Sequence, residues 1–444
     1  MSPYPVFPLG ACMIAGALEV AGHEVRQFDL LQHDQSMDVL AREVISFAPG
    51  LIGISIRNID NVNLMNEQHY INVVRTIVSR IREISSSKIL LGGAGFSLIP
   101  ALILERTGAD YGIVGEGESL AVEFVSNASK GLYPKEKLLG PETRLQGGDI
   151  CSPALDDAVI DYYMRNGGIL PVQTKRGCAY KCTYCSYPIL EGSRTRQRDP
   201  ADVVDDLEVL VNKHKAKFIF FVDSVFNDDE GAYMNVVQEM ARRGINVPWT
   251  GFFRPGGLND ETVELMKSTG LFAVEIGSDA TSDTTLDGMR KGFTFDDVVE
   301  CNELFLRHGI APAHYFMFGG PGETEKTVQE GVENIKRLRQ SMIFIFMGIR
   351  ILPETQLARL AVEQKIVGSD DGLLDSKYYI SPDVDRNWLE ETLTKAFSGM
   401  MFCIFPPDSQ DEKLRALHKM GFSGPLWDML LRSGEGKRRT RNGG

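Results

Sequence analysis

The chain has 444 residues, a hydrophobic fraction of 43% and a formal net charge of −13. This length accommodates two or three domains with a substantial core, and the apolar content is that of a globular protein. The negative charge argues against a protein that coats nucleic acid, because phosphate binding needs a basic surface.

Two further features concern the compartment. The longest apolar run, Met342–Ile349, is far too short for a membrane-spanning helix, and Met1–Leu9 does not resemble a signal peptide. Seven cysteines without a paired framework are typical of a reducing compartment, so we expect a cytoplasmic protein. The basic segment Lys437–Arg441 is predicted to be a solvated, disordered tail.

Residues 1–128 alternate short apolar segments with amphipathic ones, which indicates a doubly wound parallel sheet of the Rossmann-like type. Strands are expected at Val25–Phe28, Leu51–Ser55, Ile89–Leu91 and Tyr111–Val114. Helices are expected at Leu9–Ala21, Asp38–Phe47, Gln68–Ile84, Pro100–Thr107 and Ser119–Ala128. The chain opens in a stretch that looks like the loop after a first strand, so that strand is expected to be missing, or to lie upstream of the start.

Residues 129–168 have little apolar periodicity and are expected to form a linker. From 169 to 352 the strand–helix alternation resumes and predicts a partial (β/α)6 barrel, whose active site would lie at the carboxyl ends of the strands. Strands are expected at Ile169–Gln173, Lys217–Val222, Val247–Phe253, Phe272–Ile276, Ala313–Phe318 and Ile343–Ile349. Residues 353–444 are expected to be a small, mainly helical region that shapes the substrate pocket.

A cysteine cluster follows the first expected barrel strand. Cys178, Cys182 and Cys185 stand in the sequence KRGCAYKCTYCSY with C-x3-C-x2-C spacing. Three thiolates on one loop can hold three irons of a [4Fe–4S] cluster and leave the fourth iron open to a substrate or cofactor. A zinc knuckle is the alternative, but zinc sites usually add a fourth Cys or His at matching spacing, and this sequence offers none nearby.

This motif, with Tyr184 before the last cysteine, resembles the signature of radical S-adenosylmethionine (SAM) enzymes. The resemblance implies that the open iron chelates SAM and that an electron from the cluster cleaves it to a 5′-deoxyadenosyl radical. It also implies SAM contacts along the barrel rim, for which the matching positions are Tyr184, Asp223, Arg254, Glu275, Gly319, Gly320 and Gly322.

The amino-terminal region resembles the cobalamin-binding domain fused to many radical SAM enzymes. The resemblance implies a serine loop after one strand and a glycine turn after the next around the cobalamin, together with a closing turn. The matching positions are Ser55, Gly92, Gly93, Gly95, Gly115 and Glu116. The D-x-H-x-x-G string that ligates cobalt is absent from the sequence, so Arg57 or Asn58 is expected beside the lower face of the cobalt.

The resemblance therefore implies a cobalamin-dependent radical SAM enzyme. It would abstract hydrogen from an unactivated carbon and transfer a methyl group from methylcobalamin to a hydrophobic, lipid-like or secondary-metabolite substrate. Flavodoxin or ferredoxin would donate the electrons. Radical cyclisation or rearrangement without methyl transfer, as in the anaerobic Mg-protoporphyrin cyclase, is one alternative, and a non-catalytic cobalamin or metal sensor is another. A methylthiotransferase is disfavoured because only Cys12 precedes Cys151.

Overall fold

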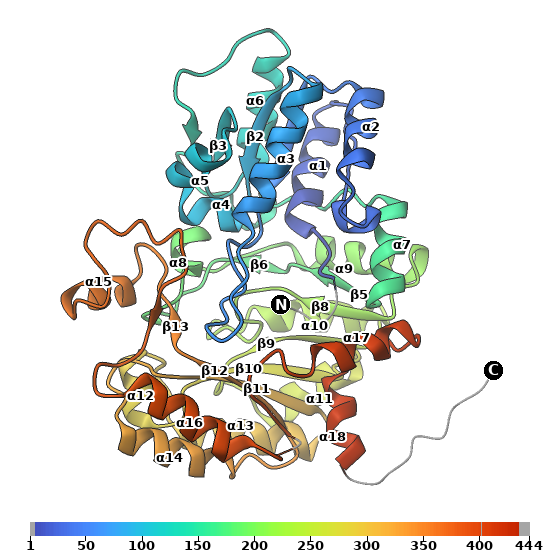
Figure 1. Cartoon of the computed structure of the whole chain (residues 1–444). Helices are drawn as coiled ribbons and strands as arrows, with labels where there is room; N and C mark the ends of the chain where they lie inside the picture. Colours follow the sequence, from blue (N-terminus) through green and yellow to red (C-terminus); the bar gives the residue numbers. More distant parts are fainter. Residues whose placement is uncertain (1–4, 401, 435–444) are drawn as a thin grey trace.

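The computed structural model describes residues 5–400 and 402–434 as two α/β units, one above the other in Figure 1. The upper unit contains a parallel four-stranded sheet in the order β1-β2-β3-β4. Its strands are β1 (Leu51–Ser55), β2 (Lys88–Gly92), β3 (Tyr111–Ile113) and β4 (Leu138–Leu139). Its helices are α1 (Leu9–Val20), α2 (Met37–Phe47), α3 (Ile71–Ile84), α4 (Ala94–Leu98), α5 (Pro100–Thr107) and α6 (Glu118–Ala128). The doubly wound architecture is confirmed.

One expected strand is not formed. Residues 23–29 carry no strand, so the prediction for Val25–Phe28 is wrong. Strand structure requires a hydrogen-bonded neighbour, and within the described residues the sheet ends at β1. Gly53 and Ser55 on this edge strand are exposed.

The segment expected to be a linker contributes to both units. Within residues 129–168, β4 pairs with β3 and completes the upper sheet. The same segment contains the 3-10 turn η2 (Gly147–Asp149) and helix α7 (Asp157–Asn166), which packs on the first barrel strand. A two-residue strand has no readable alternation, which explains why the sequence gives no sign of β4.

The lower unit is an open, fully parallel sheet of seven strands in the order β15-β12-β11-β10-β9-β8-β5. Its strands are β5 (Ile169–Val172), β8 (Phe218–Phe221), β9 (Trp249–Phe253), β10 (Ala273–Asp279), β11 (Ala311–Phe318), β12 (Met342–Met347) and β15 (Cys403–Ile404). Its helices are α9 (Pro200–Glu208), which continues into a π-helical turn η3 (Val209–Lys213), α10 (Tyr233–Arg242), α11 (Asp260–Ser268), α12 (Asp283–Gly288), α13 (Phe295–Arg307) and α14 (Glu325–Ile335). The six expected strands form, and the carboxyl-terminal region adds the seventh.

Strand alternation separates the two faces of this sheet. Side chains such as Val274 and Ile276 of β10 pack in the core beneath the outer helices. On the other face, Ala273 packs with the carboxyl-terminal helices α17 (Asp411–Lys419) and α18 (Trp427–Gly434). Helices α15 (Gln356–Glu363) and α16 (Arg386–Phe397) complete the carboxyl-terminal region.

Two pairs of short antiparallel strands lie on the upper rim of the barrel, and each pair with its connecting segment is called a hairpin below. Strand β6 (Lys175–Arg176) pairs with β7 (Arg196–Gln197), and the residues between them include the cysteine loop and α8 (Tyr187–Leu190). Strand β13 (Ile349–Arg350) pairs with β14 (Tyr378–Tyr379). Figure 1 places β6, α8 and β13 between the two units.

The basic tail at 437–441 lies outside the described residues. None of the helices within the described ranges combines the length and the apolar character that a membrane crossing needs.

Candidate functional site: a cysteine loop beneath the amino-terminal sheet

The cysteine loop is shaped by a glycine and by backbone hydrogen bonds. Gly177 has φ +91°, and a Cβ there would lie 2.0 Å from the carbonyl oxygen of Arg194. The N–H of Cys178 donates to Gly192 at 3.0 Å, and that of Cys185 donates to Cys182 at 3.2 Å. These contacts fold the loop back on itself directly after β6, where the barrel strands end.

The three motif cysteines fit an iron–sulfur cluster. Cys178, Cys182 and Cys185 are free thiols on this one loop. Within the described residues, no group of three or more His, Cys, Asp or Glu side chains is arranged to hold a single metal ion. A cluster does not require such convergence, because each thiolate binds a different iron. The donor set therefore fits a cluster better than it fits a mononuclear zinc site.

An ion pair that the sequence did not reveal stands beside the cysteines. The ammonium of Lys291 pairs with Asp279 at the end of β10, and the hydroxyl of Tyr184 donates to the same carboxylate at 2.6 Å. Burial raises the pKa of the Cys182 thiol, and the positive charge of Lys291 opposes that rise. Lys291 lies between two elements and carries no motif, which is why sequence reasoning missed it.

Asp223, expected to contact SAM, holds the start of the cysteine segment. Its Oδ1 accepts from the N–H groups of Thr174 at 2.8 Å and Lys175 at 3.3 Å, and its Oδ2 accepts from the Thr174 hydroxyl at 2.6 Å. The carboxylate is 1% exposed. Asp223 thus ties the end of β8 to the turn between β5 and β6.

Arg254 offers the clearest free donor near the cluster loop. Its guanidinium lies 4.2 Å from the ring centre of Tyr180 and 5.0 Å from that of Phe293. One terminal nitrogen donates to the carbonyl of Lys291, whereas the buried Nε has no hydrogen-bond partner among the described residues. A buried, partnerless N–H is costly, and a ligand carboxylate would satisfy it.

Glu275, expected to contact SAM from the barrel rim, lies inside the strand rather than at its end. It is the third residue of β10, four positions before the strand ends at Asp279. Its carboxyl accepts from the Tyr315 hydroxyl at 3.0 Å and from the Trp427 indole N–H at 3.4 Å. Burial raises its pKa to about 7. Glu275 therefore lies within the barrel, against helix α18.

The glycine-rich turn after β11 is held from inside the protein. The N–H groups of Gly319 and Gly320 both donate to the Glu323 carboxylate, the second at 3.1 Å. Gly319 and Gly322 have φ values of +95° and +80°. The turn, whose glycines were expected to contact SAM, is thus held in a compact shape by Glu323.

Two of the expected cobalamin-site glycines are required by close packing of neighbouring loops. Gly93 has φ +97°, and a Cβ there would lie 2.6 Å from the Ile56 carbonyl oxygen. At Gly95 a Cβ would lie 2.9 Å from the backbone of Asn58. The loop after β1 and the turn after β2 are therefore in backbone contact, and Gly92 ends β2 beside them.

The polar residues of the loop after β1 remain available. Ser55, Arg57 and Asn58 are exposed. Arg57 forms no ion pair or side-chain hydrogen bond with the described part of the chain, whereas Asp60, further along the same loop, pairs with Arg350. Helices α4 and α8 are in contact across the two units. Exposed polar side chains of this loop are thus on the same unit that contacts the cysteine segment, which fits a large polar cofactor.

Gly115 and Glu116 form the turn between β3 and α6. Gly115 has φ +80°, and its N–H donates to the Ser97 hydroxyl at 2.8 Å. The Glu116 carboxylate accepts from Arg196 and from the N–H of Leu145, each at 2.9 Å through Oε2. Glu116 therefore contacts the β6–β7 hairpin rather than facing open space.

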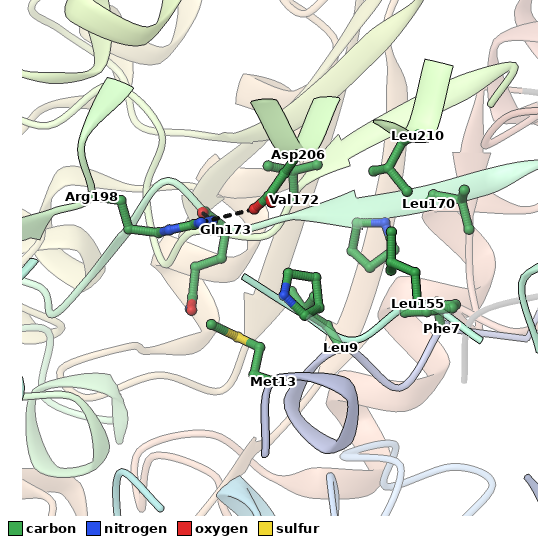
Figure 2. A pocket seen from close by; sticks show the side chains of 12 residues that line it. Phe7, Leu9, Met13, Leu155, Leu170, Val172, Gln173, Arg198, Asp206 and Leu210 are labelled. Carbon is green, nitrogen blue, oxygen red and sulfur yellow. Dashed lines mark hydrogen bonds and ion pairs between the residues drawn. The ribbon is translucent and has the colours of Figure 1, made fainter. Parts of the chain in front are cut away.

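A small pocket lies between α1 and β5. Figure 2 shows Phe7, Met13, Leu155 and Leu170 around it, with the Arg198–Asp206 ion pair at one side. Its volume of about 10 Å³ is close to the minimum that one water molecule needs. The pocket separates α1 from the first barrel strand and is too small for a substrate.

With this geometry in place, comparison with known families identifies the class. Residues 2–125 match the B12 binding domain, and residues 172–347 match the radical SAM superfamily. The chain belongs to the B12-binding radical SAM enzymes, whose cofactors are a [4Fe–4S] cluster, SAM and cobalamin.

Several known proteins are similar to this chain over most of its length. Tryptophan 2-C-methyltransferase of Streptomyces laurentii is 24% identical, over 81% of this chain and 73% of its own length. An uncharacterised methyltransferase of Pyrococcus horikoshii is 26% identical, over 74% and 73%. The anaerobic magnesium-protoporphyrin IX monomethyl ester cyclase of Rubrivivax gelatinosus is 23% identical, over 73% and 60%.

Solved structures agree on the fold. The radical SAM methyltransferase TsrM of Kitasatospora setae, with tryptophan and a SAM analogue bound, superposes with a TM-score of 0.85 at 23% identity. The alignment covers 97% of this chain and 96% of TsrM. The cobalamin-dependent SAM radical enzyme OxsB superposes with a TM-score of 0.73 at 16% identity, covering 97% of this chain and 68% of OxsB. The match to TsrM extends over both units, including the carboxyl-terminal region.

Proposed function

We propose that this enzyme transfers a methyl group from SAM, by way of cobalamin, to a small-molecule substrate. When bound, the cluster, SAM and cobalamin supply the reductive and methyl-transfer chemistry. The observation that carries the proposal is the contact between the amino-terminal cofactor loops and the cysteine segment. Helix α4, in the turn after β2, packs against α8, which begins two residues after Cys185.

The residues of this chain would divide the work as follows. Cys178, Cys182 and Cys185 hold the cluster. Arg254 would bind the SAM carboxylate through its free Nε, with the rings of Tyr180 and Phe293 beside its guanidinium. Tyr184 keeps the cysteine loop against the Lys291–Asp279 pair.

The amino-terminal loops would hold cobalamin. Ser55 and the turn Gly92–Gly95 would bind its nucleotide end, and Gly115 shapes the turn that closes the domain. Arg57 and Asn58 would take the place of the histidine that other cobalamin domains offer to the cobalt. Both are exposed, and their side chains form no hydrogen bond with the described part of the chain, which supports this assignment.

The substrate is a small molecule, and tryptophan is the one bound in the related TsrM structure. A lipid-like or secondary-metabolite substrate, which the sequence resemblance implies, is the second candidate. We expect a cytoplasmic enzyme that receives electrons from flavodoxin or ferredoxin. Cyclisation without methyl transfer is the competing reaction, because the R. gelatinosus cyclase is similar over 73% of this chain at 23% identity.

The test uses SAM that carries a trideuterated methyl group. The anaerobic holoenzyme is incubated with this SAM, a reductant and tryptophan, and in parallel with a metabolite extract. Mass spectrometry should detect a product that carries the intact deuterated methyl group. Release of 5′-deoxyadenosine with no labelled product would instead favour cyclisation or rearrangement. Intact SAM under all conditions would favour a non-catalytic sensor.

A further inference from the structure

We propose that two buried charge clamps fix the amino-terminal unit on the barrel rim and so set the separation between cobalamin and the cluster, an inference that rests on the proposed function. The first clamp joins Glu116 and Glu118 to Arg196 and Arg176. The second joins Asp60 to Arg350. Each connects a loop at the carboxyl end of an upper strand with a hairpin on the barrel rim.

The first clamp is centred on a pair of opposed arginines. Arg176 of β6 and Arg196 of β7 are direct partners in the antiparallel register. Like charges opposite each other destabilise a strand pair. Arg196 forks onto both oxygens of Glu116, and Arg176 pairs with Glu118. The glutamates of the upper unit thus neutralise a hairpin that would otherwise repel itself.

These charged groups are buried, so each depends on its partner for stabilisation. Glu116, Glu118 and Arg176 are 8%, 6% and 7% exposed. Burial opposes ionisation of Glu116, but hydrogen bonds from Arg196 and Leu145 outweigh it and hold the pKa of this carboxyl below its usual value. An unpaired charge in such a place is strongly destabilising, whereas the complete pair is satisfied only in one geometry.

The first clamp acts directly on the cysteine loop. Arg176 precedes Gly177 and Cys178 in the chain. Arg196 also donates from Nη2 to the backbone carbonyl of Glu191 at 2.6 Å. The Glu191 carboxylate in turn accepts from the Gly177 N–H at 3.0 Å. Any shift of the Glu116 turn is therefore transmitted to both ends of the loop that carries the cysteines.

The second clamp lies at the opposite side of the barrel rim. Arg350 of β13 donates to Asp60 at 2.7 Å and to the carbonyls of Ile351 and Leu373 at 2.6 and 2.7 Å. Asp60 and Arg350 are 3% and 5% exposed. Figure 1 shows the segment between β1 and α3, in blue, descending from the upper unit toward the barrel. Asp60 thus fixes this segment two residues after Asn58.

Together the clamps hold the loops after β1 and β3 at two separate points of the rim. Neither clamp includes a residue that we assign to iron or SAM binding. Burying these charges costs desolvation free energy that a hydrophobic contact in the same place would not cost. Buried ion pairs of this kind are suited to specifying one relative orientation. Asp60, Glu116, Arg196 and Arg350 are therefore positioning residues.

The experiment compares R196K and R350K with the wild-type holoenzyme and with R242K, an exposed arginine of α10 far from the interface. Lysine keeps the charge but loses the fork of the guanidinium. Hydrogen exchange measured by mass spectrometry is the first readout. Iron content and uptake of hydroxocobalamin are measured on the same samples, and pulsed EPR measures the separation of the reduced cluster from Co(II).

In R196K we expect at least about tenfold faster exchange in peptides covering 114–118 and 177–192, and in R350K in peptides covering 56–66. Iron content should be retained, and the distribution of cluster–cobalt separations should broaden in both variants. R242K should match the wild type. Unchanged exchange at these peptides would overturn the proposal, as would a uniform rise throughout both units, which indicates a general role in stability.

Separate results would contradict the proposed function and the role of the clamps. A wild-type protein that takes up no hydroxocobalamin contradicts the proposed function, but the exchange comparison still tests the clamps. A wild-type protein that binds cobalamin, together with R196K and R350K variants that keep its separation distribution, contradicts the clamps alone.

Discussion

The chemistry of single residues in this enzyme depends on partners far away in the sequence. Arg254 stacks on Tyr180 and donates to the backbone of Lys291, while Lys291 itself pairs with Asp279. These groups place the Arg254 charge and the Lys291–Asp279 ion pair beside the cysteine loop.

Cluster binding should require the three motif cysteines but not the other thiols. Replacing Cys178, Cys182 or Cys185 with Ala should abolish the cluster, because two thiolates cannot hold it. Cys151→Ser is the matched control, since Cys151 lies outside the loop and only donates to the Met13 carbonyl. Iron and sulfide analysis of anaerobically purified protein checks this. Full iron retention in any of the three motif variants would contradict the assignment.

The buried carboxyl of Glu275 predicts a pH dependence of stability. Its pKa is raised to about 7, so the folded protein keeps it protonated where the unfolded chain has lost the proton. Its contribution to stability is therefore undiminished below about pH 4.5 and falls as pH rises to about 7, by up to about 3 kcal/mol. The Glu275→Gln variant should lose less stability than the wild type between about pH 5.5 and about pH 8.

Thermal unfolding of apo-protein at the two pH values measures this difference. Glutamine can still accept from Trp427 and can donate to the Tyr315 hydroxyl oxygen, so the fold should be retained. Glu105→Gln, an exposed position of α5, is the control. Identical pH dependence in Glu275→Gln and the wild type would rule out a protonated Glu275.

At the scale of elements, the loops at the carboxyl ends of strands form the candidate cofactor sites. The loop after β1 and the turn after β2 meet through glycines, and the β6–β7 hairpin carries the cysteines. These contacts are backbone contacts, so they tolerate little change in side-chain volume.

Gly93→Ala should therefore disrupt the cobalamin loops. The change imposes a positive φ on alanine and brings a Cβ within 2.6 Å of the Ile56 carbonyl oxygen. Gly22→Ala is the control, because Gly22 has φ +85° but nothing within 4 Å of a Cβ. The control should cost about 1–2 kcal/mol from backbone strain alone. Gly93→Ala should cost at least about 1 kcal/mol more.

Denaturant unfolding measures both costs, and equilibrium dialysis measures the affinity for hydroxocobalamin. Gly93→Ala should also weaken cobalamin binding, whereas Gly22→Ala should not. Equal stability of the two variants would show that the loops after β1 and β2 relax freely around the added methyl group.

The elements differ in how far the sequence predicted them. The barrel strands are continuous apolar runs bounded by helices, and all six were predictable. Val25–Phe28 reads as a strand but has no neighbour to pair with, and β4 and β15 have only two residues each. The cysteine motif was legible because its spacing is local. The partners of Glu116 and Asp60 lie 80 and 290 positions away, so their roles could not be read locally.

At the scale of the whole molecule, two parallel sheets meet through their functional ends. The upper unit presents the loops after β1, β2 and β3, and the barrel presents the cysteine loop and the β13–β14 hairpin. Binding sites at the carboxyl ends of strands are expected in both architectures. The arrangement brings the two sets of candidate cofactor residues to the same side of the contact between the units, where α4 meets α8.

The most direct test of this account is the cofactor content of the full-length protein. It would be isolated without oxygen, supplied with hydroxocobalamin, and analysed for iron, sulfide and tightly bound corrinoid. The account predicts one [4Fe–4S] cluster and one cobalamin in each chain, both retained through gel filtration. Protein that keeps the cluster but releases all corrinoid would contradict the claim that these two sites form one methyl-transfer centre.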